Sequence, residues 1–292
     1  MPERRTPARR SPLWWVATPL CLVYAAGVFA LLALRFFLPA WPVPLALYGF
    51  LGPFLYAPLI LLLPLAFFSR ARPAVAATLA AVALFMGLYL PLFLPRVGAV
   101  PPAVGPTITA MAFNLGPGVS QPAGLTEAIA GVGADLVAVE ELYPEAVAAF
   151  DAALAARYPY RILPAEQGAS GLLSRYPILA YERFRPAGVG RAALQAALEV
   201  EGLPAHVFVL HPEPPIHRVG PPGQKAPRLY ERQLEAQLAD VIGRAEGLAG
   251  PVLVMGDFNM GDQGRSYTVI SRALGDAMPG LDIAKMPESE LL

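Results

Sequence analysis

The chain has 292 residues, with 22 Lys and Arg against 22 Asp and Glu, so its formal net charge is zero at pH 7. This balance excludes a protein that is basic throughout, as a wholesale nucleic-acid binder would be. Apolar residues make up 55% and charged residues only 15%, which is too apolar for an ordinary water-soluble protein. Part of the chain is therefore expected in lipid. The single cysteine, Cys21, excludes an intramolecular disulfide and a multi-cysteine metal site.

Three apolar runs occupy the first third of the chain, at about residues 13–38, 45–68 and 74–94. A helix needs about 20 apolar residues to cross a bilayer, and each run is that long. A cleaved signal peptide is the alternative for the first run, but the apolar core of a signal peptide is shorter. The runs lack the acids and histidines of a transport path. The sequence thus predicts a membrane anchor of three transmembrane helices over residues 1–96.

The basic residues beside these runs predict the orientation of the anchor, because positively charged loops stay on the cytoplasmic side. They are Arg4, Arg5, Arg9 and Arg10 before the first run, and Arg70 and Arg72 after the second. Three crossings then place the N-terminus in the cytoplasm and everything after the third run outside it. We therefore expect an integral protein of the plasma or inner membrane whose second half is extracytoplasmic.

Short strand-like runs alternate with helical stretches after a linker at residues 97–106, which predicts an α/β domain over residues 107–292. The predicted strands are 107–113, 135–139, 171–174, 192–200, 205–210 and 251–255. Helices are predicted at about 125–132, from Pro144 onward, and at about 228–246. In the helix that Pro144 opens, Val147, Phe150 and Leu154 would form one apolar face.

Polar residues directly follow four of the predicted strands, which is where α/β domains place their sites. They are Asn114, Glu141, His211 and the pair Asp257 and Asn259. Each alone has an ordinary structural interpretation, such as a turn former, a helix start or a satisfied polar side chain. Their joint appearance after strands favours a functional site.

Five stretches of sequence, four of which contain these residues, follow one another over about half of the chain. They are Met111–Leu115, Ala134–Leu142, Gly171–Ile178, Val209–Pro212 and Val254–Asn259, the last containing Gly-Asp-Phe-Asn. Together they resemble the endonuclease/exonuclease/phosphatase superfamily, which has the fold of pancreatic deoxyribonuclease. The resemblance implies a four-layer α/β/β/α sandwich and a metal-dependent phosphoester hydrolase, with phosphodiesters as the expected substrates.

The resemblance also implies roles for single residues. Glu141, with Asn114 and Asp257, would bind Mg²⁺ or another divalent cation such as Mn²⁺, which prefers such oxygen ligands. His211, Asp257 and Asn259 would be catalytic, with Asn259 orienting the phosphate and His211 assisting the leaving group. Glu140 falls where the family often has Gln, and no role is assigned to it.

The sequence departs from the family after Asn259. The family's late Asp and its terminal Ser-Asp-His stretch are not recognisable, and no histidine follows His217. We therefore expect a domain that is incomplete at its C-terminus. The alternative to an enzyme is a non-catalytic, membrane-tethered binding module or an inactive fragment.

A basic segment lies between the fourth and fifth of these stretches. Arg218, Lys225 and Arg228 are candidates for binding a substrate phosphate, while a merely solvated loop is the other interpretation. The segment lacks the interleaved aromatic residues of a single-strand-binding surface. The substrate stays open between nucleic acid, phospholipid headgroup and small phosphoester. No protein partner is inferred.

Overall fold

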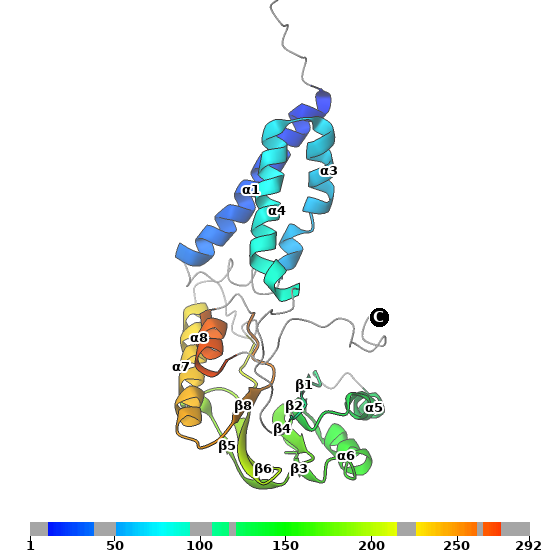
Figure 1. Cartoon of the computed structure of the whole chain (residues 1–292), viewed down its shortest axis with the longest axis vertical. Coiled ribbons are helices and arrows are strands. Elements are labelled where there is room, and N and C mark those ends of the chain that lie inside the picture. The colour runs from blue at the N-terminus through cyan, green and yellow to red at the C-terminus, as the bar shows by residue number, and fades with distance from the viewer. Residues whose placement is uncertain are drawn as a thin grey trace, which may run out of the picture. The chain divides into compact units, whose positions relative to one another are not determined.

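A computed structural model of the chain describes residues 11–37, 51–93, 107–116, 121–214, 226–261 and 265–275. The chain divides into two compact units, an N-terminal helical unit that extends to Gly98 and a second unit over Ala99–Gly275 (Figure 1). The two units are considered separately below.

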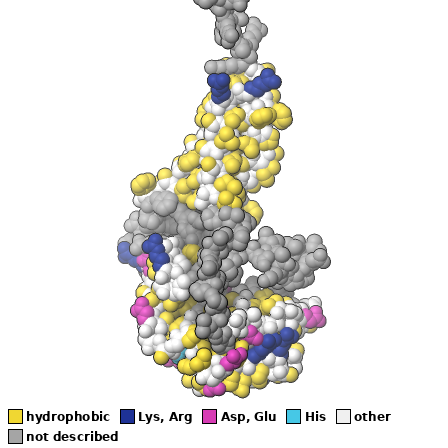
Figure 2. Space-filling model, viewed as in Figure 1, with side chains coloured by type: hydrophobic (Ala, Val, Ile, Leu, Met, Phe, Trp, Pro, Cys, Tyr) yellow, Lys and Arg dark blue, Asp and Glu magenta, His cyan; other side chains and the backbone are white. Residues whose placement is uncertain are grey.

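The helical unit contains α1 (Pro12–Phe37), α3 (Leu59–Ser69) and α4 (Arg72–Phe93), with a short 3₁₀ helix at Pro53–Tyr56. Its helices pack through small side chains, because Ala17, Cys21, Ala66, Ala71 and Ala74 are all fully buried in one cluster. Small residues let helix backbones approach closely, as they do in membrane bundles. Hydrophobic side chains cover the outside of this unit in the view of Figure 2.

Two described helices, Pro12–Leu34 and Arg72–Leu90, are long and apolar enough to cross a membrane by length and composition alone. The middle run differs from the single helix expected over residues 45–68. It contains the 3₁₀ turn and then α3, which is 11 residues long. Pro53 and Pro58 cause this break, because proline lacks the backbone N–H that a helix interior needs. A third full-length span therefore stays a prediction, and residues 38–50 lie outside the described part.

The second unit begins with a four-stranded sheet, called sheet A, in the order β1-β2-β4-β3. Its strands are β1 (Ala110–Asn114), β2 (Leu136–Leu142), β3 (Tyr160–Ile162) and β4 (Ala169–Ser174). Strands β1 and β2 are parallel and are joined by α5 (Pro122–Val132), while α6 (Pro144–Ala153) follows β2. Both helices cover one face of the sheet, where Ile129 and Phe150 are fully buried against Val137 and Val139.

A second four-stranded sheet, sheet B, has the order β5-β6-β7-β8. Its strands are β5 (Ile178–Phe184), β6 (Ala193–Val200), β7 (Leu203–Val209) and β8 (Val252–Met255), with a 3₁₀ turn at Pro186–Gly188 before β6. Helix α7 (Ala226–Glu246) joins the parallel pair β7 and β8, and α8 (Arg265–Leu274) follows. Leu234, Leu238 and Val241 of α7 pack on Phe208 of this sheet.

The two sheets pack face to face through a second apolar cluster. Leu136, Ala138 and Leu172 of sheet A meet a set of side chains from sheet B, namely Leu194, Ala196, Leu198, Val207 and Val209. The unit therefore has the layers helix, sheet, sheet and helix, as predicted. Because both faces of β2 are covered, the strand is apolar at consecutive positions rather than alternating.

Every predicted strand and helix of the second unit is present, with ends shifted by a few residues. Three elements were not predicted: β3, β5 and α8. Strand β5 is at an edge of its sheet, and its middle residues, including Leu179 and Tyr181, are exposed. It begins with the apolar residues Ile178–Tyr181, which are half-buried or exposed, and continues with the charged residues Glu182 and Arg183. Neither a strict alternation nor a longer apolar run therefore marks it as a strand. The expected incompleteness concerns residues 276–292, which lie outside the described part of the chain.

Candidate active site

The polar residues after the strands converge from both sheets. Asn114 ends β1 and Glu141 lies near the end of β2 in sheet A, while His211 and Asp257 each follow a strand of sheet B by two residues. Asn114 Nδ2 donates a hydrogen bond to Asp257 Oδ2 across the two sheets at 2.9 Å. His211 Nε2 lies 3.6 Å from Glu141 Oε1 and 4.0 Å from Asp257 Oδ2. These four predicted residues therefore form one cluster.

A β-bulge brings the Glu141 side chain to this cluster. The pairing of β2 with β4 shifts register between Val139 and Leu142, and Glu141 takes the left-handed conformation with φ of 57°. This conformation is unfavourable for a residue with a Cβ and is found most often where function requires it. The extra residue changes the phase of the strand, so Glu140 points between the sheets while Glu141 reaches the site.

The Gly-Asp-Phe-Asn segment is a tight turn against the end of β7. At Gly256, whose φ is 127°, an added Cβ would lie 2.1 Å from the carbonyl oxygen of Leu210, so only glycine fits. Asn259, with φ of 50°, donates its backbone N–H to Asp257 Oδ1 at 2.9 Å. Its Nδ2 donates to the Pro212 carbonyl oxygen at 2.8 Å. Asn259 thus holds Asp257 in place and ties the turn to the residue after His211.

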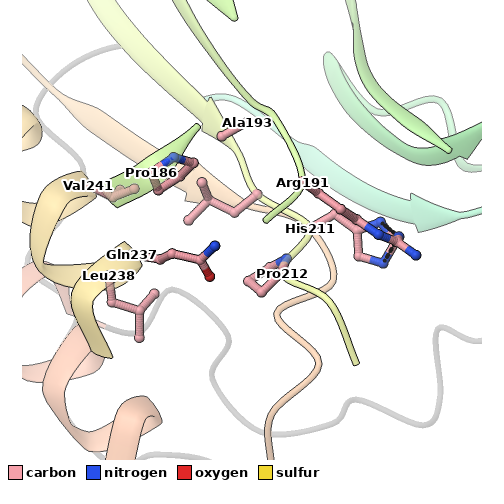
Figure 3. Close-up of a pocket in the computed structure, with 9 residues that line it drawn as sticks. Pro186, Arg191, Ala193, His211, Pro212, Gln237, Leu238 and Val241 are labelled. Atoms are coloured by element: carbon pink, nitrogen blue, oxygen red, sulfur yellow. Dashed lines mark hydrogen bonds between the residues drawn. The ribbon is translucent and has the colours of Figure 1, made fainter. Parts of the chain in front are cut away.

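Arg191 is a member of the cluster that the sequence analysis did not single out. Its Nη1 lies 3.2 Å from Glu141 Oε1 and 2.6 Å and 3.0 Å from the two ring nitrogens of His211. Figure 3 shows the guanidinium beside the imidazole. The sequence offered one indication, a charged residue two positions before an apolar strand. The other site residues were instead identified at the ends of strands.

His211 is held as a neutral imidazole. Its side chain is 1% exposed, and burial lowers its pKa below the usual range. The positive charge of Arg191 lowers the pKa further, while the carboxylates of Asp257 and Glu141 oppose the shift. A neutral imidazole has one acceptor nitrogen, and this nitrogen accepts a hydrogen bond from Arg191.

Glu140 is a second residue whose environment the sequence did not reveal. It is fully buried, and among the described residues its carboxyl oxygens have no hydrogen-bond partner of good geometry. Burial, followed by the nearby negative charge of Asp257, raises its pKa to about 8, while the backbone N–H groups of Glu140 and Phe113 oppose the rise. Glu140 is therefore protonated at neutral pH and resembles in charge the glutamine that was expected there.

The donor atoms of the cluster suit a hard divalent cation. Glu141 Oε1 and Asp257 Oδ2 both lie within 4.0 Å of the same imidazole nitrogen, so the two carboxylates face a common point. Asn114 turns its Nδ2 toward Asp257, while its Oδ1 accepts from the Gly116 backbone N–H at 2.9 Å. In the described part of the chain, no three His, Cys, Asp or Glu side chains form a metal-binding group. Mg²⁺ nevertheless binds through one or two carboxylates and fills its shell with water, so this donor set fits it.

A small pocket lies beside the cluster. His211 and Arg191 form one wall, and Pro186, Leu210, Leu238 and Val241 form an apolar wall with Gln237 among them (Figure 3). Of the three predicted phosphate-binding residues, Arg218 and Lys225 lie outside the described part of the chain. Arg228 lies in the first turn of α7, where only the backbone is described.

A family model described as "Endonuclease/Exonuclease/phosphatase family" matches residues 111–284, more than half of the chain. The chain belongs to this family. The match includes every residue of the cluster, and the predicted family is thereby confirmed. Because endonucleases, exonucleases and phosphatases all hydrolyse phosphoesters, the chain belongs to a family of phosphoester hydrolases.

Solved structures of this fold are similar to the chain at low identity. TDP2 of D. rerio, complexed with a single-strand DNA product, is 16% identical with a TM-score of 0.44, over 56% of this chain and 64% of its own. Sphingomyelinase C of Streptomyces griseocarneus is 19% identical with a TM-score of 0.47, over 60% and 72%. Beta toxin of Staphylococcus aureus is 14% identical with a TM-score of 0.43, over 57% and 72%. The chain thus spans just under two thirds of TDP2. No curated protein matched it.

Proposed function

We propose that this family member is a divalent-metal-dependent phosphodiesterase that its N-terminal helices tether to a membrane. The observation that carries the proposal is the convergence of Asn114, Glu141, His211 and Asp257 from the ends of four strands in two sheets. Elements far apart in the sequence must fold together to bring these groups within about 4 Å. A binding module without chemistry has no need for two carboxylates around a buried, neutral histidine.

Glu141 and Asp257 would hold the cation, with Mg²⁺ or Mn²⁺ as the expected ions. The predicted third ligand, Asn114, would have to turn its amide to bind, because its Oδ1 accepts from the Gly116 N–H and its Nδ2 donates to Asp257. When bound, such a cation polarises the phosphate and offsets the charge on the leaving oxygen. Asn259 holds Asp257 through its backbone N–H and fixes the direction of the Asp257 carboxylate. His211, neutral at pH 7, directs an N–H toward a phosphate oxygen, and the preorganised donor stabilises the charge that develops there.

The membrane part of the proposal rests on α1 and α4. Residues 1–96 would form the anchor, residues 97–106 a linker, and residues 107–292 the hydrolase domain. Two apolar helices of sufficient length support this arrangement. Arg70 lies between α3 and α4, and Arg72 is the first residue of α4. Both favour a cytoplasmic position for this connection and an extracytoplasmic one for the domain.

The proposed substrates are phosphodiesters, whether in nucleic acid, a lipid headgroup or a small molecule. A tethered domain meets lipid headgroups at high local concentration, which supports a phospholipid. Among the solved structures similar to this chain, one is described with DNA and another is a sphingomyelinase. A direct comparison of hydrolysis of a phospholipid and of a nucleic acid would therefore distinguish the two substrate classes.

The proposal is tested by hydrolysis of bis(p-nitrophenyl) phosphate with the full chain in detergent. We expect hydrolysis that requires Mg²⁺ or Mn²⁺ and stops with EDTA. Glu141→Gln removes a proposed metal ligand and His211→Asn a proposed phosphate contact, so each should lower kcat/KM by roughly 100-fold or more. The matched control is Glu166→Gln, since Glu166 pairs with Arg183 in an exposed ion pair outside the cluster.

The control should keep the activity of the unchanged chain. Full activity in both site variants would refute the assignment of the site. A chain that folds and binds a divalent cation but hydrolyses no phosphodiester would instead favour the non-catalytic binding module. Comparing sphingomyelin vesicles with single-stranded DNA then separates the two substrate classes.

The orientation has its own test, which is protease protection of cells with an intact cytoplasmic membrane. We expect an added protease to reach the second unit from outside, while a cytoplasmic marker protein stays uncut. Cleavage of the second unit only after the membrane is lysed would contradict an extracytoplasmic domain. Release of the whole chain by alkaline carbonate washing would contradict the anchor itself.

A further inference from the structure

The position of Arg191 raises a question about the cation site. Its guanidinium lies against the same Glu141 oxygen that faces His211, at 3.2 Å, and it is the positive group nearest to the proposed metal ligands among the described residues. A guanidinium and a divalent cation on one carboxylate oxygen repel each other strongly at such distances. Arg191 therefore cannot keep its present contact with Glu141 while a divalent cation binds the same carboxylate oxygen.

The Arg191 backbone is fixed, so any relief must come from its side chain. The preceding loop is fastened to α7 at two points: Gln237 Nε2 donates to the Val189 carbonyl oxygen at 2.8 Å, and the Ala187 N–H donates to Asp240 Oδ2 at 2.8 Å. At Gly190, a Cβ would come within 2.6 Å of Gln237 Nε2, so the loop fits tightly against the helix. The Arg191 side chain, 28% exposed, is long enough to swing while its backbone stays in place.

We propose that Arg191 is an exchangeable counter-ion of this site. Without metal it neutralises Glu141, and when a divalent cation binds it leaves Glu141 and pairs with the phosphate of the substrate. This inference rests on the proposed function, because it needs a metal at Glu141 and a phosphoester beside His211. A guanidinium suits both partners, since its planar fork pairs equally with carboxylate and phosphate oxygens.

The exchange has a thermodynamic consequence that does not require turnover. Metal alone must displace Arg191 and so binds more weakly, whereas metal with a phosphodiester gives Arg191 a new partner and binds more tightly. The two ligands should therefore show positive coupling, and the coupling must be reciprocal. A residue that served only to hold the fold would not produce this linkage.

The test is calorimetric titration of the full chain in detergent with Mn²⁺, with and without dimethyl phosphate as a simple phosphodiester. For the unchanged chain we expect dimethyl phosphate to tighten Mn²⁺ binding by roughly 5-fold or more, within the range usual for coupled sites. In Arg191→Gln, Mn²⁺ alone should bind several-fold more tightly. The effect of dimethyl phosphate should shrink to the part that direct contact between the cation and the phosphate supplies. Arg191→Lys retains the charge and should keep weak Mn²⁺ binding.

The matched control is Arg183→Gln, which removes an arginine of the same sheet that pairs with Glu166 at the surface. It should bind Mn²⁺ like the unchanged chain. Unchanged or weaker Mn²⁺ binding in Arg191→Gln would overturn the inference. If that variant does not fold, Arg191→Met, which also removes the charge, supplies the same decision. Failure to hydrolyse any phosphodiester would count against the proposed function alone, because the linkage is measured without turnover. A chain that binds no Mn²⁺ would overturn both.

Discussion

The space between the two sheets has two regions that differ sharply in chemistry, although the same strands line both. In the middle of the sheets, Leu136, Leu172, Leu198 and Val207 form an apolar core with no charged member. At the carboxyl ends of β2, β7 and β8, the space holds Glu140, Glu141, His211 and Asp257 instead. One strand therefore passes within a few residues from an apolar core to a cluster of buried ionisable groups.

The apolar region between the sheets stabilises the second unit, whereas the polar end lowers its stability. Apolar burial between the sheets is favourable in proportion to the area removed from water. A buried carboxyl that has no hydrogen bond of good geometry among the described residues costs free energy, and so do two residues in the left-handed conformation. The apolar region must supply enough stability for the polar end to keep this arrangement.

The largest expected effect comes from the apolar region. Leu198 is fully buried between the sheets, and Leu198→Ala should lower the free energy of unfolding of the second unit by roughly 2–5 kcal/mol, because a cavity replaces well-packed atoms. Leu179→Ala is the control, since Leu179 is 60% exposed on β5. Hydrogen exchange of the β6 and β7 amides measures both changes. A loss for Leu179→Ala as large as for Leu198→Ala would show that sheet B is not stabilised through this core.

A smaller and pH-dependent effect is expected at the polar end. The folded-state pKa of Glu140 is about 8, above the value of 4.5 for an unperturbed glutamate. Between these two values the folded chain binds a proton that the unfolded chain has lost, so stability falls as the pH rises through that window. Glu140→Gln removes this loss. In EDTA, it should stabilise the second unit at pH 8.5 and have little effect at pH 4.5.

The measurement is again hydrogen exchange, corrected for the pH dependence of the intrinsic rates. Glu166→Gln is the control, because hydrogen bonding to Arg183 holds the pKa of Glu166 below its usual value. The stability that the Glu166–Arg183 pair contributes is lost only as the pH falls through the lowered pKa of Glu166. Between pH 5 and 8.5, the stability of the Glu166→Gln control should therefore change with pH in the same way as that of the unchanged chain. Equal pH dependence of the unchanged chain and Glu140→Gln would show that Glu140 is charged in the folded state.

The fold of the second unit was largely predictable because its buried strands are covered on both sides. Such strands are short apolar runs, and β2, β4, β6 and β7 were all recognised in this way. The edge strand β5 was missed because its apolar start, Ile178–Tyr181, passes into charged residues without alternation, and the short β3 because three residues carry little pattern. In the first unit, hydropathy located the apolar runs, and the prolines of the second run mark where the structure departs from one continuous helix.

The candidate site was predictable for residues at or just after the carboxyl end of a strand, and not for Arg191, which precedes one. Asn114, Glu141, His211, Asp257 and Asn259 were all found by their place at strand ends, and the structure brings them together. Arg191 reaches the site from the opposite end of a strand, through a loop that α7 fixes by tertiary contacts. No local pattern encodes such a contact.

Glu140 illustrates a different limit of the sequence. Two adjacent glutamates look alike in the sequence, yet one is buried between the sheets and the other reaches the site. The bulge in β2 makes this distinction, and its position depends on pairing with β4. The sequence could identify the pair but could not assign a different environment to each member.

The bulge in β2 also determines how this strand responds to two kinds of genetic change. Val139 and Leu142 both pack toward the helices, although an unbroken strand would turn them to opposite faces. Loss of one codon between them would remove the bulge and leave Val139 and Leu142 two positions apart, so both would still face the helices in a regular strand. A missense change at Glu141 removes the carboxylate and keeps the bulge, whereas deletion of the Glu141 codon removes both. A descendant of this gene could therefore lose the carboxylate of β2 by either route while the apolar packing of the strand is kept.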